Sequence, residues 1–257
     1  MTRQHLSFPC EGQELVGTLD YAEGEAGLLI VGGGNEIRAG AFSGMARLAA
    51  RLATAGYPVL RFDRRGVGDS EGENRGFRDS GADIAAALKC FLAEAPHMGR
   101  VHAFGICDAA SALMLNRGTG FHGLVLANPW TMEDEDSPPP PSAVRARYGE
   151  KLRNPAELKR LLTGKVSPRG LLKGLLQAIR PAPEPTSLSG EMAEGLATFK
   201  GNVRILLSDR DRTAQIFEVV WQSQDYRIER CPGASHAFAE PESADWLYHQ
   251  LIETLSA

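Results

Sequence analysis

The sequence predicts an α/β protein built on a mostly parallel sheet that helices cover on both faces. Short, wholly apolar segments such as residues 28–31 and 124–127 alternate with longer segments in which apolar residues recur at helical spacing. Strands buried on both faces of a parallel sheet show such continuous apolar runs. With 257 residues, of which 43% are hydrophobic, the chain is long enough for one domain with an insertion.

The elements follow in order along the chain. Residues 6–8 and 15–21 flank a turn at residues 11–13 and predict an antiparallel hairpin at the sheet edge. After it, strands and helices alternate, and the first helix is expected to stop at Gly56. The expected strands are residues 28–31, 58–62, 101–104, 124–127, 203–207 and 226–231, and the expected helices are residues 42–52, 80–95, 108–116 and 243–255.

A segment of different composition interrupts this alternation. Residues 1–130 and 200–257 are expected to form the core, and residues 131–199 a helical cap or lid. Between residues 145 and 180 there are ten basic residues against two acidic ones. Such a segment would suit an anionic group on a substrate or carrier, and an ordinary solvated helical face explains it equally well.

The overall composition narrows the class of protein. A formal net charge of -4 and a pI near 5.9 argue against nucleic-acid binding. No segment has 18 uninterrupted apolar residues and the N-terminus lacks the apolar run of a signal peptide, so we expect no stable membrane insertion and a cytoplasmic location. The four cysteines form no CxxC pair, and the sequence predicts no disulfide scaffold, metal or cofactor.

One cysteine stands in a special context. Gly105-Ile106-Cys107-Asp108-Ala109 follows a predicted strand and opens an alanine-rich helix, and it resembles the Gly-x-Ser-x-Gly nucleophile elbow of α/β-hydrolases. Small residues on either side leave room for a strained turn, and a helix N-terminus favours the thiolate of Cys107. The carboxylate of Asp108 would oppose that thiolate if it pointed inward. The alternative is that Cys107 is a buried structural cysteine, which is the role expected for the other three cysteines.

Two later loops offer a base and an acid. His236 lies between the last predicted strand and the last helix and is the candidate general base, whereas His102 is expected to be a strand residue. Asp209 and Asp211 follow the strand 203–207, and the usual spacing of the acid turn favours Asp211. A solvated Asp/Arg turn is the alternative. Nucleophile, acid and base then occur in the chain order that this fold uses.

The oxyanion formed during acyl transfer needs backbone donors. The amide of Asp108 is one candidate, and the second is the amide of Gly34 or Asn35 in the glycine loop after the strand 28–31. No lysine follows this loop with Walker spacing and no Gly-x-Gly-x-x-Gly occurs, so nucleotide binding there is not expected.

Other motifs extend the resemblance. Residues 62–72 are similar to the Asp-x-Arg-Gly-x-Gly-x-Ser block of α/β-hydrolases, and the cysteine elbow partly matches that of dienelactone hydrolases. Residues 32–33, 58–72, 104–112 and 151–170 resemble the exosortase A system-associated hydrolases of type 1, bacterial proteins encoded near exopolysaccharide and PEP-CTERM sorting genes. This resemblance covers nearly the whole chain, and the Cys-Asp pair is similar to that family's own pattern.

These features predict a hydrolase that acts on an ester or thioester through Cys107, His236 and Asp211 and a covalent acyl-cysteine intermediate. The substrate would be a small-molecule or carrier-bound acyl compound. Two alternatives stay open: an acyltransferase that uses the same intermediate, and a non-catalytic binding protein of an exopolysaccharide or protein-sorting system. The sequence leaves the acyl chain and the oligomeric state open.

Overall fold

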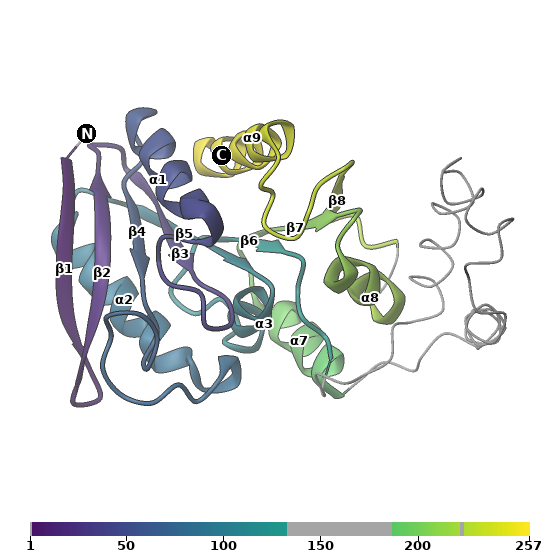
Figure 1. Ribbon diagram of the computed structural model, residues 1–257, viewed down its shortest axis with the longest axis horizontal. Coiled ribbons are helices and arrows are strands. Elements are labelled where there is room, and N and C mark those ends of the chain that lie inside the picture. The colour runs from purple at the N-terminus through teal and green to yellow at the C-terminus, as the bar shows by residue number, and fades with distance from the viewer. Residues whose placement is uncertain (1, 133–186, 222–223) are drawn as a thin grey trace, which may run out of the picture.

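The computed structural model describes residues 2–132, 187–221 and 224–257, and the structural statements below refer to these residues. The predicted α/β-hydrolase fold is confirmed: eight strands form one sheet in the order β1-β2-β4-β3-β5-β6-β7-β8 (Figure 1). The strands are β1 (Thr2–Cys10), β2 (Gln13–Tyr21), β3 (Ala26–Val31), β4 (Val59–Phe62), β5 (Arg100–Ile106), β6 (Gly123–Ala127), β7 (Asn202–Ser208) and β8 (Ile228–Cys231).

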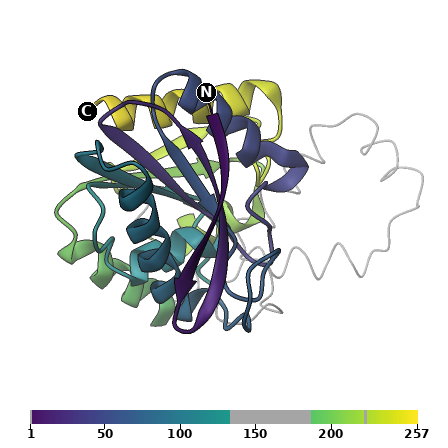
Figure 2. The ribbon, with the colours of Figure 1, turned by 90° about the vertical axis from the view of Figure 1, so that its left-hand side faces the viewer.

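The predicted N-terminal hairpin is present at one edge of the sheet. Strands β1 and β2 pair antiparallel around Glu11 and Gly12, whose φ angles of 49° and 81° suit a tight hairpin turn. Strand β2 also pairs antiparallel with β4, and from β4 to β8 all neighbours are parallel. Figure 2 shows this hairpin in front of the rest of the sheet.

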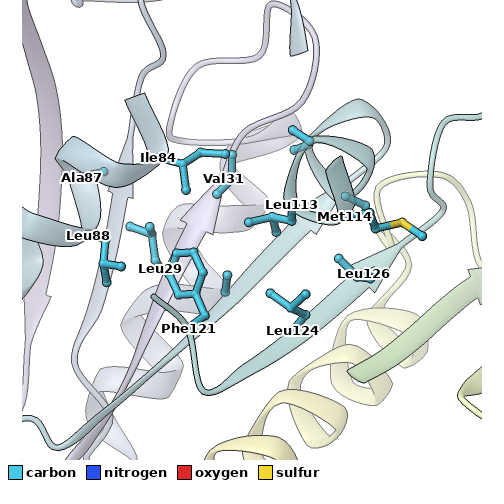
Figure 3. Packing of buried hydrophobic residues seen from close by; sticks show 14 of the residues in the cluster. Leu29, Val31, Ile84, Ala87, Leu88, Leu113, Met114, Phe121, Leu124 and Leu126 are labelled. Atoms are coloured by element: carbon cyan, nitrogen blue, oxygen red, sulfur yellow. The ribbon is translucent and has the colours of Figure 1, made fainter. Parts of the chain in front are cut away.

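Helices cover both faces of the sheet (Figures 1 and 2). On one face lie α1 (Gly44–Thr54) and α9 (Pro241–Ser256), and on the other α2 (Gly81–Glu94), α3 (Asp108–Leu115) and α7 (Ser187–Thr198). Strand β3 serves both layers because successive side chains point to opposite faces. Leu28 and Ile30 pack in the cluster of α1 and α9, whereas Leu29 and Val31 pack with α2 and α3, as Figure 3 shows.

Some elements differ from the prediction. Strand β8 begins at Ile228 rather than at residue 226, and the side chain of Tyr226 is 93% exposed. Helices α7 and α8 (Arg212–Val220) were not predicted, because the sequence of α7 contains two glycines and that of α8 is short and β-branched. Two short 3-10 helices, Ala41–Ser43 and Phe77–Asp79, precede α1 and α2.

Helix α7 lies within residues 131–199, the range predicted as an insertion, but it packs on the core. Leu188, Met192 and Leu196 are buried in the same cluster as the residues of α3. Helix α7 therefore contributes to the same hydrophobic cluster as α3, and the predicted division of the chain stays a prediction. The rest of the predicted lid, with the basic segment 145–180, lies outside the described residues and stays a prediction.

The arrangement of the parallel strands determines where a site can form. The chain segments that follow β3, β5, β6, β7 and β8 all leave the same, carboxyl-terminal edge of the sheet, where ligands bind in open α/β folds. These segments contain the candidate catalytic residues and the candidate oxyanion donors that the sequence predicts. Within the described part of the chain, no helix is both long and apolar enough to cross a membrane.

Candidate active site

Cys107 stands at a strained turn between β5 and α3. Its φ and ψ angles are 62° and -128°, a region that costs a non-glycine residue on the order of 1–3 kcal/mol. Backbone hydrogen bonds hold the turn: the Cys107 N–H donates to the Ala127 carbonyl at 2.9 Å, and the Cys107 carbonyl accepts from the Ala110 N–H at 3.1 Å. The thiol is therefore presented at the first turn of a helix, as in a nucleophile elbow.

Small residues make this turn sterically feasible. A methyl group on Gly105 would lie 2.8 Å from the carbonyl carbon of Ala109, which is fully buried. A methyl group on Gly33 would lie 2.7 Å from the Ile106 carbonyl oxygen. The elbow and the glycine loop after β3 thus touch through glycines, in accord with the mechanical role expected for Gly105 and Ala109.

His236 and Asp211 meet at the same sheet edge. The His236 Nδ1 lies 2.9 Å from Asp211 Oδ1, and the side chains are 42% and 8% exposed. Asp211 is also the N-cap of α8, because its Oδ2 accepts from the Ala214 N–H at 2.9 Å. One carboxylate therefore both begins a helix and orients the imidazole, with Nε2 left for another partner.

The environment of His236 strongly favours its charged form. The hydrogen bond with Asp211 is the main cause that raises the pKa of His236 from its ordinary 6.5 to about 10, and a hydrogen bond with Cys107 is the second cause. Burial acts in the opposite direction. Cys107, His236 and Asp211 consequently form one hydrogen-bonded chain, which the sequence predicted from three separate loops.

The two candidate aspartates differ in their contacts. Asp209 is exposed, and its Oδ1 accepts from the Gly233 N–H at 2.7 Å. The partner of His236 is Asp211. Asp209 instead ties the turn after β7 to the turn after β8.

Asn128 is a site residue that the sequence analysis missed. It is fully buried with a φ of 45°, and its Nδ2 donates to the His236 carbonyl and to the Ser208 Oγ, both at 3.0 Å. Its Oδ1 accepts from the Ser208 N–H at 2.8 Å. Asn128 therefore fixes the histidine loop to the end of β7. The available signal was an asparagine directly after the apolar run 124–127.

The glycine loop departs from the expected arrangement. The Gly34 N–H, predicted as a donor to the oxyanion, donates to Asp108 Oδ1 at 2.6 Å. Arg64 Nη2 donates to the Gly34 carbonyl at 2.6 Å and lies 3.4 Å from Asp108 Oδ2. The side chain of Asn35 accepts from Asn74 Nδ2 at 2.7 Å. The Gly34 amide is thus engaged by Asp108, because the negative carboxylate attracts this loop donor and the buried guanidinium compensates its charge.

A cavity of about 620 Å³ opens beside Cys107. Asp108 and Gly34 line it next to the thiol, and its other walls combine apolar side chains with two arginines: Phe77, Trp130, Met132, Leu188, Arg75 and Arg78. Its size suits a small organic molecule. In the described residues, no group of three His, Cys, Asp or Glu side chains is arranged to hold a metal ion.

The sheet order and the elbow at its carboxyl edge define a class of enzyme, the hydrolases built on a mostly parallel sheet with catalytic groups on its loops. The model of the α/β-hydrolase family matches residues 28–250. The chain belongs to this family, and the prediction of an α/β-hydrolase enzyme is confirmed. None of the curated proteins matches the sequence.

Solved structures agree on the fold. An esterase of Pyrococcus furiosus is 16% identical with a TM-score of 0.64, over 99% of this chain and 90% of that chain. An α/β serine hydrolase homologue from Coxiella burnetii is 15% identical with a TM-score of 0.60, over 99% and 98%. Est1E from Butyrivibrio proteoclasticus, solved with ferulic acid bound, is 16% identical with a TM-score of 0.64, over 98% and 100%. At these identities the likeness concerns the fold.

Proposed function

We propose that this α/β-hydrolase cleaves an ester or thioester through a covalent acyl intermediate on Cys107. The observation that carries the proposal is the hydrogen-bonded chain from Asp211 through His236 to Cys107, which lines the cavity. Because the pKa of His236 is about 10, the imidazole holds a proton at neutral pH. An imidazolium beside Cys107 favours nucleophilic attack by its sulfur.

In the first half of the reaction the Cys107 sulfur attacks the carbonyl carbon of the substrate. A C–S bond forms and the carbonyl electron pair moves to oxygen. When the tetrahedral intermediate collapses, the bond to the alcohol or thiol leaving group breaks, and His236 gives its proton to that group. An acyl-cysteine and a neutral imidazole remain.

In the second half, water attacks the acyl-cysteine while neutral His236 takes one of its protons. The carbonyl electron pair again moves to oxygen, and the C–S bond breaks as the carboxylic acid is released. The thiolate and the imidazolium are restored. Asp211 holds the imidazole with Nε2 toward the reacting atoms throughout, because it binds Nδ1.

The oxyanion of both intermediates requires backbone donors. We assign this role to the amide of Asp108 and to the glycine loop at Gly34 or Asn35. For Gly34 to serve, the Asp108 carboxylate must first leave its N–H, and Arg64 is the cation beside that carboxylate.

The proposal also includes the group of hydrolases to which the enzyme belongs and its location in the cell. The motifs in residues 58–72 and 104–112 support a place among the exosortase A system-associated hydrolases. All four cysteines are free, which agrees with a location in the reducing cytoplasm.

Steady-state kinetics test this function with p-nitrophenyl butanoate and butanoyl-CoA as probes. We expect turnover by the wild type and a loss of at least about a thousandfold in Cys107→Ala and His236→Gln. Product analysis with added amine or alcohol separates hydrolysis from acyl transfer to those acceptors. Unchanged turnover in Cys107→Ala would refute the proposal.

A further inference from the structure

The cationic side chains around the cavity differ in how their charge is compensated. Arg78 Nη1 lies 2.7 Å from Glu191 Oε2, and Arg64 lies beside the carboxylate of Asp108. Arg75 also lines the cavity, but it has no hydrogen-bond or ion-pair partner among the residues that the structure describes. Among the described residues that line the cavity, Arg75 is therefore the one arginine whose charge is not compensated by a carboxylate.

The segment that carries Arg75 is held through its neighbour Asn74. Asn74 Nδ2 donates to Asn35 Oδ1 at 2.7 Å, and Asn74 Oδ1 accepts from the Gly76 N–H at 2.9 Å. The Asn74 backbone packs so closely on Gly66 that a methyl group there would collide with it. Asn74 thus ties the backbone next to Arg75 to the glycine loop and to Gly66.

The rest of the cavity is largely apolar. Phe77, Trp130, Met132 and Leu188 contribute side chains to its wall. A ligand that fills it should bury a short hydrocarbon portion and place one anionic group near Arg75. A planar guanidinium can bind a carboxylate through two parallel hydrogen bonds. This contact would fix the orientation of the ligand, which apolar contacts alone do not.

We propose that Arg75 is a specificity-determining residue that binds a carboxylate of the substrate, so that the preferred ester or thioester is an anionic one. This inference rests on the proposed function for the reaction itself. The carboxylate belongs either to the acyl half, as in the half-ester of a dicarboxylic acid, or to the leaving group. In both cases the substrate carries one carboxylate that can contact Arg75 while its ester or thioester carbonyl lies at Cys107.

Matched pairs of esters distinguish the two halves. The first pair is mono-p-nitrophenyl glutarate and p-nitrophenyl pentanoate, which have the same acyl length and leaving group and differ in one carboxylate. The second pair is 3-carboxyphenyl pentanoate and phenyl pentanoate, which places that carboxylate in the leaving group. The expected result is a kcat/KM higher by about tenfold for the charged member of one pair, with a preference that falls as salt is added.

Three variants assign the preference to Arg75. Arg75→Gln should lower kcat/KM for the charged ester by about tenfold and leave the neutral ester unchanged, and Arg75→Lys should restore part of the loss. Arg117→Gln is the matched control, because Arg117 is exposed and lies outside the cavity. It should behave as the wild type with all four esters.

A binding experiment tests the inference independently of turnover. Monomethyl glutarate should protect Cys107 from alkylation by iodoacetamide in the wild type and in Arg117→Gln, and protection should be lost in Arg75→Gln. Absence of turnover with all four esters, while this protection holds, would refute the proposed function and not the carboxylate site. Equal turnover of both members of each pair, or a preference or protection that survives in Arg75→Gln, would overturn the inference.

Discussion

The backbone N–H of Gly34 donates a 2.6 Å hydrogen bond to the carboxylate of Asp108, the residue that directly follows Cys107. An internal anion therefore occupies a donor that acyl transfer would need for the developing oxyanion. Arg64 contacts both partners, the carbonyl of Gly34 at 2.6 Å and the carboxylate of Asp108 at 3.4 Å. The resting site holds its own negative charge next to the nucleophile and compensates it with a buried cation.

Removal of that negative charge should make the thiolate easier to form. In Asp108→Asn the side-chain oxygen can still accept from Gly34, but the repulsion of a neighbouring thiolate disappears. We expect iodoacetamide to alkylate Cys107 several-fold faster at pH 6 to 7 than in the wild type, as measured by peptide mass spectrometry. Asp209→Asn is the control, since that carboxylate binds the Gly233 amide. An equal or slower rate in Asp108→Asn would contradict this account.

The contact between Arg64 and Asp108 should appear as an energetic coupling. Arg64→Met leaves a carboxylate beside the elbow without its cation, and the loss of one partner of a largely buried pair costs roughly 1–3 kcal/mol or more. In an Asp108→Asn background the same change should cost less. Urea unfolding of the wild type, both single variants and the double variant measures this difference. Additive effects, within about 0.5 kcal/mol, would show that the two side chains are not coupled.

The variant Asp211→Asn separates the role of Asp211 as a helix cap from its role as the partner of His236. Asparagine caps helices as well as aspartate does, so Asp211→Asn should keep the cap on the Ala214 N–H and the thermal stability. It replaces the carboxylate whose hydrogen bond is the main cause of the high pKa of His236 and whose charge adds to that effect, so that pKa should fall from about 10. We expect kcat to fall by roughly a thousandfold or more. NMR titration of His236 and ester kinetics check both parts, with Asp209→Asn as the control.

Full activity in Asp211→Asn together with a loss in Asp209→Asn would reverse the assignment of the acid. Loss of both stability and activity in Asp211→Asn would instead show that the helix cap, and not the charge, is what the site requires.

His102 should make the fold sensitive to acid. Its side chain is buried in β5, neither ring nitrogen has a hydrogen-bond partner, and burial lowers its pKa to about 4. Below pH 6.5 His102 binds a proton in the unfolded chain, whereas in the folded state it does so only below about pH 4. Stability is therefore lost as the pH falls through this window, by up to roughly 3 kcal/mol.

The corresponding variant is His102→Leu, which is close in size and does not titrate. Urea unfolding at pH 7 and pH 5 should show a smaller loss of stability for this variant than for the wild type. The same loss in both proteins would assign the acid sensitivity to other groups.

The parts of the molecule that the sequence could predict are those with a local signal. The apolar run of β3 and the small residues around Cys107 express the steric needs of a buried strand and a tight turn, and both were predicted. The Gly34–Asp108 bond joins residues 74 positions apart, and Asn128 joins loops 80 and 108 positions away. Such contacts leave no periodic pattern, because they depend on how the strands are ordered in the sheet.

The pairing of His236 with Asp211 was predicted only through the chain order of the fold and the spacing of an acid turn. Its physical basis, the helix cap that orients the Asp211 carboxylate, became visible only with α8, an element that the sequence analysis did not predict.

The central claim is that Cys107 carries the acyl group during turnover. Rapid mixing with p-nitrophenyl butanoate, acid quench within the first turnovers and peptide mass spectrometry would measure it directly. We expect a butanoyl adduct on the peptide that contains Cys107 and none in Cys107→Ala. In His236→Gln the adduct should accumulate if acylation of Cys107 is faster than hydrolysis of the acyl-cysteine. Turnover in the wild type with no adduct on Cys107, or with an adduct on another residue, would contradict the account.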